Sequence, residues 1–228
     1  MSKLRLVLAA VAALAVLVVG GSWFYVKVID KPAAKLTIDS TSSHGSTTTV
    51  DPSSDDGSTD GTWKVSSASV VQYRVKETLF GASNDATGGT NQVTGSIAIA
   101  GSSVSSGSFT VDMTAISSDK AQRDGQFQNR IMNTSQFPTA SFKLTSPITL
   151  SAVELNKEIT AKATGNLTLH GVTKSVTFNV VAKRVTGQIK VNGNIPIRFS
   201  DYSINNPSGG PAQVGNDGTL EFTLVLTR

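Results

Sequence analysis

The feature that most constrains the fold of this chain is an alternation of apolar and polar side chains with a period of two residues. In Gln92–Ala100, for example, Val93, Ile97 and Ile99 share one face, while threonine, serine and alanine occupy the other. Successive side chains of a β-strand point to opposite faces, so the pattern predicts strands. It recurs in about nine segments of residues 62–228, marked by Trp63 and Val65, Tyr73 and Val75, Val93–Ile99, Ser108–Ala115, Phe142 and Leu144, Leu167 and Leu169, Val176–Val180, Ile189–Phe199, and Leu220–Leu226. About eight antiparallel strands of this kind form a sandwich or a closed barrel.

The polar faces of these strands indicate which side meets water. They carry charged residues such as Lys143, Lys190 and Glu221, whereas the opposite faces carry almost only Phe, Ile, Leu, Val and Met. An outer-membrane barrel would turn its apolar face to lipid, but its biogenesis does not begin with a retained membrane helix. We therefore expect a mainly β, water-soluble barrel whose apolar faces line the interior.

One segment, between Ser117 and Phe137, departs from the strand pattern. It is rich in Gln, Arg and Asn and predicts one broken helix or two short helices. Ser118 is the expected N-cap, since a serine hydroxyl can accept a hydrogen bond from the first turn. Pro138 is expected to end the helical segment before the next strand.

Three glycines lie in phase with the apolar faces of their strands, namely Gly95, Gly165 and Gly193. If they point inward, they remove side-chain volume from a lumen that is just wide enough to hold one small ligand. A leucine at Gly95 is then expected to obstruct the lumen of a folded domain. The alternative is that each glycine marks a bulge or a bend at a barrel corner.

The N-terminus contains an uncharged stretch of 21 residues, Leu6–Val26, with Lys3 and Arg5 before it. At about 1.5 Å per residue it covers roughly 30 Å, the hydrocarbon thickness of a bilayer. The basic flank predicts a single-pass helix with a cytoplasmic N-terminus and an extracytoplasmic C-terminal domain. The alternative is a cleaved signal peptide, which would make the protein secreted.

A polar segment separates this stretch from the barrel. Asp39–Gly61 has 12 Ser or Thr and five Asp among 23 residues, too few apolar groups to fold alone. As a flexible coil it would span roughly 25 Å and leave the domain's orientation free. The expected organisation is an anchor or signal peptide at 1–30, a Ser/Thr/Asp-rich linker at 31–61, and the β-domain at 62–228.

Composition argues against most catalytic and metal-binding classes. The chain has no cysteine and only two histidines, His44 and His170, and it lacks the serine-hydrolase, phosphate-loop and zinc-peptidase motifs. We expect no enzyme activity, no metal and no cofactor. A net charge of +4 with only 16% charged residues makes nucleic acid an improbable partner, and oligomeric state cannot be read from the sequence.

Three segments resemble signatures of one family. They are Gly61–Val65, the pair formed by Gln122–Phe127 and Phe137–Phe142, and Gly165–Val176 with its Leu-His-Gly-Val-Thr-Lys core. In this order and spacing they resemble a YceI-like domain, a family of exported polyisoprenoid-binding proteins. The likeness extends from Gly61 to Arg228, although Gln126 and Phe127 stand where relatives often have His and Leu.

The resemblance implies a lipocalin-like antiparallel barrel with a long apolar tunnel that holds an isoprenoid chain, such as a polyprenyl lipid or an isoprenoid quinone. It implies no catalytic residue. The residues expected to line the tunnel, each of which could instead be ordinary core, are Phe109, Val111, Met113, Phe127, Ile131, Phe142, Leu144, Phe178, Val180, Phe199 and Phe222.

Two other functions remain open at the level of the sequence. A barrel packed solid would be a structural or surface-interaction domain, and a barrel with a reactive mouth would be an enzyme acting on an isoprenoid. His170 is expected at a strand end, where a structural hydrogen bond near Gly171 is favoured over catalysis. Arg123 is expected to fix the helix to the barrel rim, or alternatively to contact a lipid head group.

Overall fold

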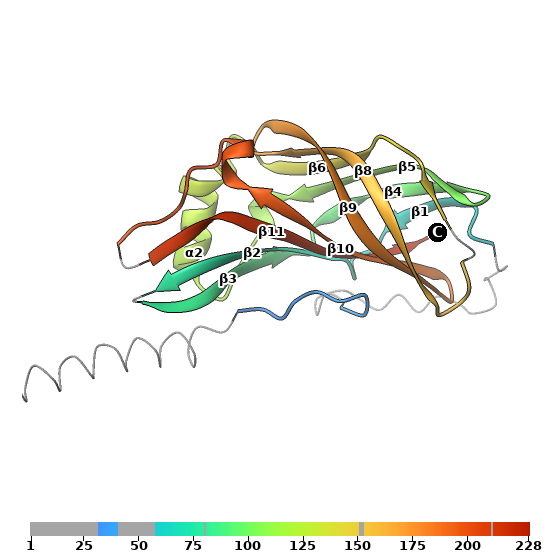
Figure 1. Ribbon diagram of the computed structural model, residues 1–228, viewed down its shortest axis with the longest axis horizontal. Coiled ribbons are helices and arrows are strands. Elements are labelled where there is room, and N and C mark those ends of the chain that lie inside the picture. Colours follow the sequence, from blue (N-terminus) through green and yellow to red (C-terminus); the bar gives the residue numbers. More distant parts are fainter. Residues whose placement is uncertain (1–31, 41–57, 80, 151–152, 211) are drawn as a thin grey trace, which may run out of the picture.

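Eight strands close into an antiparallel barrel in the computed structural model, which describes residues 32–40, 58–79, 81–150, 153–210 and 212–228. Around the barrel the order is β1 (Gly61–Val65), β4 (Val93–Ala100), β5 (Ser103–Asp112), β6 (Thr139–Leu144), β8 (Glu158–Leu169), β9 (Val172–Val185), β10 (Gln188–Arg198) and β11 (Ala212–Thr227) (Figure 1). The ring closes where Lys64 and Val65 of β1 pair with Thr227 and Leu226 of β11. This confirms the predicted mainly β antiparallel barrel of about eight strands.

A long hairpin extends the barrel at one end. Strand β2 (Val70–Leu79) pairs with β11 between Ala212 and Thr223, and β3 (Ala82–Thr90) pairs with β2. Gly89 of β3 exchanges two backbone hydrogen bonds with Ser117, at 2.8 and 3.1 Å. The sequence pattern did not predict β3, nor the short β7 (Ile148–Thr149), which pairs with β5.

The helical segment lies at the same end as this hairpin. α2 (Ala121–Gln126) runs directly into the π-helical turn η4 (Phe127–Ile131), which agrees with the broken helix expected between Ser117 and Phe137. Two 3₁₀ turns, η3 (Met113–Ala115) and η5 (Phe199–Tyr202), follow β5 and β10. The strand expected at Ser108–Ala115 therefore ends at Asp112.

The predicted N-cap is wrong. The helix begins after Lys120, which contributes no capping side chain. The Ser118 hydroxyl instead donates a 2.6 Å hydrogen bond to the carboxylate of Asp124, which also accepts the Ser118 N–H at 2.8 Å. This pair fastens the loop before the helix to the helix itself.

The apolar stretch Leu6–Val26 lies outside the described residues. Within the part of the chain that the structure describes, no helix is both long enough and apolar enough to cross a bilayer.

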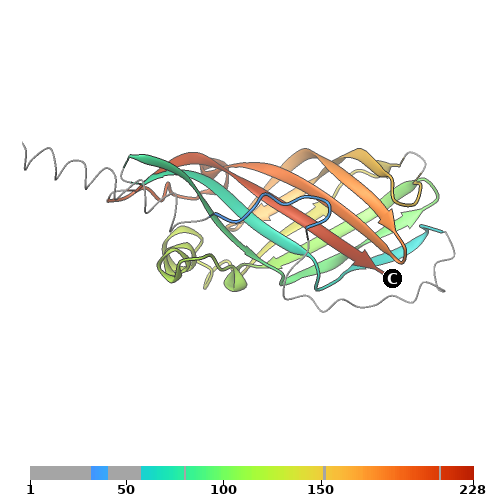
Figure 2. The same ribbon diagram turned by 90° about the horizontal axis from the view of Figure 1, so that it is seen from below.

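Residues 32–40, here called the strap, lie along the outside of the barrel (Figures 1 and 2). The Ala33 N–H donates to Thr87 Oγ1 at 2.9 Å, and the Ala34 carbonyl accepts from Gln72 Nε2 at 2.9 Å. Farther along, the Thr37 carbonyl accepts from Thr223 Oγ1 at 2.8 Å. These strap residues belong to the predicted linker, yet Ile38 within the strap is buried, with 9% of its surface exposed.

Beneath the strap, the outward-facing side chains of β2 and β11 form a buried polar stripe. Arg74 donates to Glu221 at 2.8 Å and to Asp85 of β3 at 3.2 Å, and its remaining nitrogen reaches the Ala33 carbonyl at 2.9 Å. Glu221 also accepts from Gln72, at 2.5 Å. These groups satisfy one another and the strap backbone, which offsets the cost of removing charges from water.

We expect the stabilisation from this stripe to disappear in acid. Burial would raise the pKa of Glu221, but hydrogen bonds from Arg74, Gln72 and the Leu36 N–H outweigh burial and lower it. The folded chain then binds a proton less readily than the unfolded chain, so stability is full above the ordinary carboxyl pKa of about 4 and falls as pH drops through the lower folded value. In urea unfolding, Glu221→Gln should therefore cost stability at pH 7 and progressively less toward pH 3.

A matched substitution controls for loss of charge alone. Glu158 lies exposed at the start of β8, and Glu158→Gln should follow the parent protein at every pH. If the stability that Glu221→Gln loses relative to the parent protein stays constant down to pH 3, the ionised carboxylate of Glu221 is not the source of the stabilisation.

Candidate functional site: two adjoining apolar cavities

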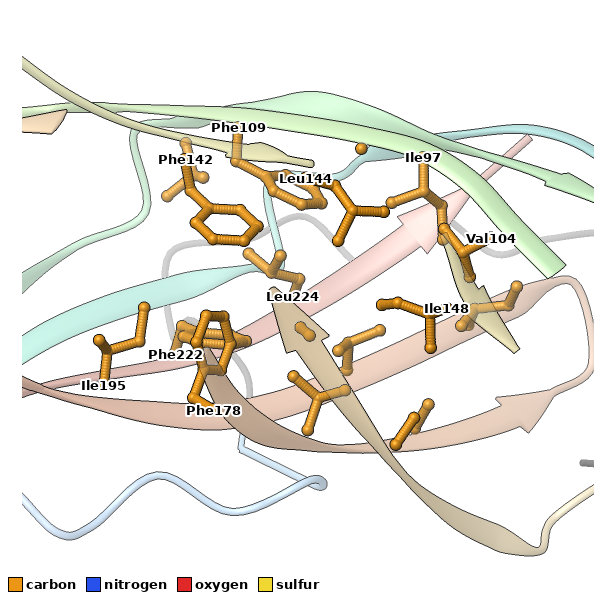
Figure 3. Close-up of a pocket in the computed structure, with 18 of the residues that line it drawn as sticks. Ile97, Val104, Phe109, Phe142, Leu144, Ile148, Phe178, Ile195, Phe222 and Leu224 are labelled. Carbon is orange, nitrogen blue, oxygen red and sulfur yellow. The ribbon is translucent and has the colours of Figure 1, made fainter. Parts of the chain in front are cut away.

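The inward faces of the barrel strands enclose a first cavity of about 150 Å³. Figure 3 shows the ring of Phe109, the ring of Phe142 and Leu144 facing Phe178 and Phe222 from the opposite wall. The lining is almost entirely aliphatic and aromatic. An apolar cavity of about this size stays dry and can admit a small apolar molecule, whereas a single water occupies about a tenth of it.

A second cavity, of about 180 Å³, lies between the β2–β3 hairpin and the helical segment. The rings of Tyr73 and Phe127 stack across it, 5.1 Å apart with an interplanar angle of 7°. Its lining is mainly apolar, with the polar residues Gln72 and Thr219 and, near the end of the barrel, a polar rim of Glu77, Arg123 and Gln126. A mainly apolar space with a polar rim suits a ligand with a greasy tail and a polar end.

The two cavities meet at a waist, defined here as Val71, Val111, Ala140 and Leu220, which line both. Val111 and Ala140 face each other across β5 and β6, while Val71 and Leu220 come from β2 and β11 on the other wall. These side chains are short compared with the phenylalanines on either side. The two cavities therefore adjoin at the waist.

Two of the three in-phase glycines, Gly165 and Gly193, provide seats for aromatic rings rather than empty space. A Cβ on Gly193 would lie 2.7 Å from Cζ of Phe222, and one on Gly165 would lie 2.6 Å from Cε2 of Phe142. Because no side chain intervenes, these rings can lie against the barrel wall. Phe178 packs edge-on against both rings, with centroids 5.4 Å from Phe142 and 6.0 Å from Phe222.

Gly95 differs from the other two, and the expectation that leucine there would obstruct the lumen of a folded domain is wrong. Its φ is +139°, and a Cβ would collide with the backbone carbonyl of Ser108 and come within 2.8 Å of the Phe109 Cα. The constraint on Gly95 is thus a close approach of β4 to β5. Gly95 pairs with Phe109 in regular register, and the register shift between these strands lies at Ala98 and Ile99.

All eleven residues expected to line a tunnel lie around these cavities, although their contact with a ligand stays a prediction. The first cavity is lined by Phe109, Val111, Phe142, Leu144, Phe178, Val180 and Phe222. The second is lined by Val111, Met113, Phe127, Ile131 and Phe199.

Other lining residues were missed. Ile97, Leu224 and Tyr73 lie in predicted strands and have the correct phase, so alternation alone could have identified them. Ile148 belongs to the two-residue strand β7, which is too short to show a period.

At the rim, Arg123 connects the helix to the barrel. Its guanidinium lies 3.5 Å from Glu77 of β2 and also pairs with Asp119. Burial raises the pKa of the nearby Tyr73 hydroxyl, and the charge of Arg123 only partly opposes this effect, so the phenol stays protonated. The rim therefore offers both hydrogen-bond donors and acceptors.

His170 lies outside both cavity linings. It occupies the two-residue β8–β9 turn with Gly171, and both residues have positive φ, 50° and 76°, as a turn that matches the twist of a hairpin requires. Nδ1 donates to the Tyr202 carbonyl at 3.1 Å, and the ring packs edge-on against Phe137 at 4.6 Å. This is a structural role, with the bond made to η5 rather than within its own turn.

Among the described residues, no group of three His, Asp or Glu side chains is placed to hold a metal ion. What the site offers is apolar enclosure, with Glu77, Arg123 and Gln126 at the rim of the second cavity and Lys183 and Arg184 in the lining of the first.

Comparison with known proteins agrees with this geometry. The family model described as a YceI-like domain matches residues 63–226. Curated relatives called UPF0312 protein, from Pseudomonas savastanoi pv. phaseolicola and Pseudomonas syringae pv. syringae, are each 33% identical over 112 residues, which cover 46% of this chain and 54% of theirs. The chain thus spans about half the length of the curated relatives it matches.

Solved structures share the fold at low identity. A polyisoprenoid binding domain of Saccharophagus degradans, implicated in plant cell wall breakdown, superposes with a TM-score of 0.59 at 14% identity, over 73% of this chain and 97% of that one. BcnA of Burkholderia cenocepacia gives 0.56 at 19% identity, over 71% and 98%. The YceI protein of Campylobacter jejuni gives 0.51 at 17% identity, over 62% and 84%.

Proposed function

The chain belongs to the YceI-like domain family, and we propose that it binds a long-chain isoprenoid lipid, either a polyprenyl lipid or an isoprenoid quinone, inside the barrel. The observation that carries this proposal is the pair of apolar cavities that adjoin at the waist. The polyisoprenoid binding domain among its structural relatives supports the same ligand class.

The lining suits a prenyl chain for a physical reason. Such a chain is long, branched and apolar, so it needs an elongated dry space and no particular polar partner. Each buried CH₂ contributes about 0.8 kcal/mol, so several prenyl units outweigh a hydrogen bond to the head group, which contributes about 1 kcal/mol. We infer that the tail sets the affinity and that the rim near Arg123 receives the polar end.

The proposal includes a location and a mode of action. Leu6–Val26 would anchor the protein in the cytoplasmic membrane with the barrel outside the cytoplasm, or would release the protein as a secreted one if cleaved. The barrel would shield the lipid tail from water without altering it chemically. The cavities favour this function over a solid structural domain, and His170 lies outside both cavity linings, where it donates a hydrogen bond to the Tyr202 carbonyl.

Lipid analysis of the full chain tests the proposal. After purification in mild detergent, native mass spectrometry should show an adduct, and solvent extraction should release a molecule with prenyl fragments. A sample stripped of lipid should regain the adduct from vesicles that contain an isoprenoid quinone or a polyprenyl phosphate, but not from vesicles of phospholipid alone. If the protein stays ligand-free through both steps, it does not bind an isoprenoid lipid and the proposal is wrong.

A further inference from the structure

The strap contacts the barrel in a fixed direction. Its first contacts, made by Ala33, are with Arg74 and Thr87 on β2 and β3, in the part of the barrel that carries the hairpin and α2 (Figure 2). Its last contacts are those of Asp39 with Lys190 at 3.5 Å and Lys183 at 3.9 Å, toward the opposite end. The described strap therefore begins toward the end of the barrel that holds the second cavity and runs toward the other end.

The strap binds to a specific surface of the barrel, here called the dock, which is formed by five polar residues. Gln72, Arg74, Thr87, Glu221 and Thr223 point away from the lumen, yet each has 8% or less of its surface exposed. Each of them exchanges a hydrogen bond with the backbone of the strap. An outer barrel face normally presents such groups to water, so their burial indicates a surface shaped to hold this segment.

The spacing in the sequence limits the distance between the apolar stretch and the docked strap. Only six residues, 27–32, separate the end of the apolar stretch at Val26 from the first docked residue, Ala33. Fully extended, six residues reach about 20 Å, whereas the 16 residues of β11 extend about 50 Å. The Ser/Thr-rich segment that follows the strap comes after the dock along the chain, so it does not set the distance between anchor and barrel.

We propose that the strap is an orienting clamp, which holds the barrel with the second cavity and its polar rim toward the bilayer. This inference rests on the proposed lipid binding and on membrane anchoring through Leu6–Val26. The membrane surface is the partner, and the end of the barrel with α2, Glu77 and Arg123 is the surface that meets it. A lipid tail could then pass between bilayer and lumen without crossing bulk water.

Energy transfer from single labels to the membrane tests the orientation. The chain has no cysteine, so Gln122→Cys on α2 and Ser102→Cys in the β4–β5 hairpin each give one labelling site, at opposite ends of the barrel. Both positions are exposed. With the full chain in phospholipid vesicles that carry acceptor lipids, transfer from position 122 should exceed transfer from position 102 severalfold. Equal transfer, the reverse order, or a chain that does not co-float with the vesicles would overturn the proposal.

A strap variant shows whether the dock causes the orientation. Leu36→Pro with Ile38→Gln removes the N–H that Glu221 accepts and the buried side chain of the strap, and should bring the two transfer efficiencies together. The matched control, Ala34→Gln with Lys35→Gln, changes two exposed strap positions and should keep the difference. If the first variant also keeps the full difference, the strap does not set the orientation.

Lipid content measured on the same samples separates this inference from the proposed function. A barrel that retains isoprenoid but shows equal transfer from both labels contradicts only the clamp. A barrel that stays empty but shows the expected difference contradicts only lipid binding.

Discussion

Replacing Ala140 with phenylalanine should abolish binding of long isoprenoids while shorter ones still bind. Ala140 is buried, with 3% of its surface exposed, and it belongs to the waist at which the two cavities adjoin. A benzyl group at this position would fill the passage between the β5–β6 wall and the β2–β11 wall. A long tail would then be confined to one cavity.

The expected loss follows from the length of chain excluded. A prenyl unit contains five carbons, so each unit kept out of the lumen costs about 4 kcal/mol at full burial, or roughly a thousandfold in Kd. Isothermal titration or tryptophan quenching with isoprenoid quinones should show that the affinity of the parent protein rises with the chain length of the quinone. In Ala140→Phe the affinity should reach a plateau at the length that fills one cavity.

Two further variants make the result interpretable. Ala100→Phe places the same ring at an exposed position of β4 and should bind like the parent protein. Overpacking by a phenyl ring costs about 1–3 kcal/mol, so Ala140→Leu provides a smaller obstruction should the larger variant unfold. If a folded Ala140→Phe protein binds the longest quinones as tightly as the parent protein does, the tail does not cross the waist.

The inward faces of the barrel could be read from the sequence because alternation is a local property. Phe142, Phe178 and Phe222 each belong to a run with polar neighbours on both sides, so their direction follows from the strand assignment alone. Alternation did not predict β3, because its sequence, Ala-Ser-Asn-Asp-Ala-Thr-Gly-Gly-Thr, has hardly any apolar side chain. Its glycines are needed for another reason, since the Tyr73 ring lies over Gly88, 2.7 Å from where a Cβ would be.

The dock of the strap could not be predicted from patterning. Gln72, Arg74 and Glu221 occupy outward-facing positions, where polar residues are expected to be solvated, and nothing local marks them as buried. Their burial depends on a segment about 40 to 190 residues away in sequence. Residues 34–39 show a weak strand-like alternation of polar and apolar side chains, but this pattern does not indicate the surface on which the strap lies.

Gly95→Ala should be among the most damaging single substitutions in the barrel, although it adds one methyl group. Gly95 combines a φ of +139°, which residues with a side chain rarely adopt, with a Cβ position that collides with the Ser108 carbonyl. Relief requires β4 to move away from β5, which would break a ladder that runs from Val93↔Val111 to Ala100↔Ser103. We expect a loss on the order of 4 kcal/mol or more in the free energy of unfolding, enough to leave a marginal domain largely unfolded.

Gly107 supplies the matched control, since it lies on the neighbouring strand β5. A Cβ there would lie 3.3 Å from Cγ2 of Ile97 and 3.7 Å from Cβ of Leu144, both side-chain atoms that can shift by a few tenths of an ångström. Gly107→Ala should therefore change the urea midpoint little, because it also removes backbone freedom from the unfolded chain. Equal behaviour of the two variants would mean that β4 and β5 are not held in close approach at Gly95.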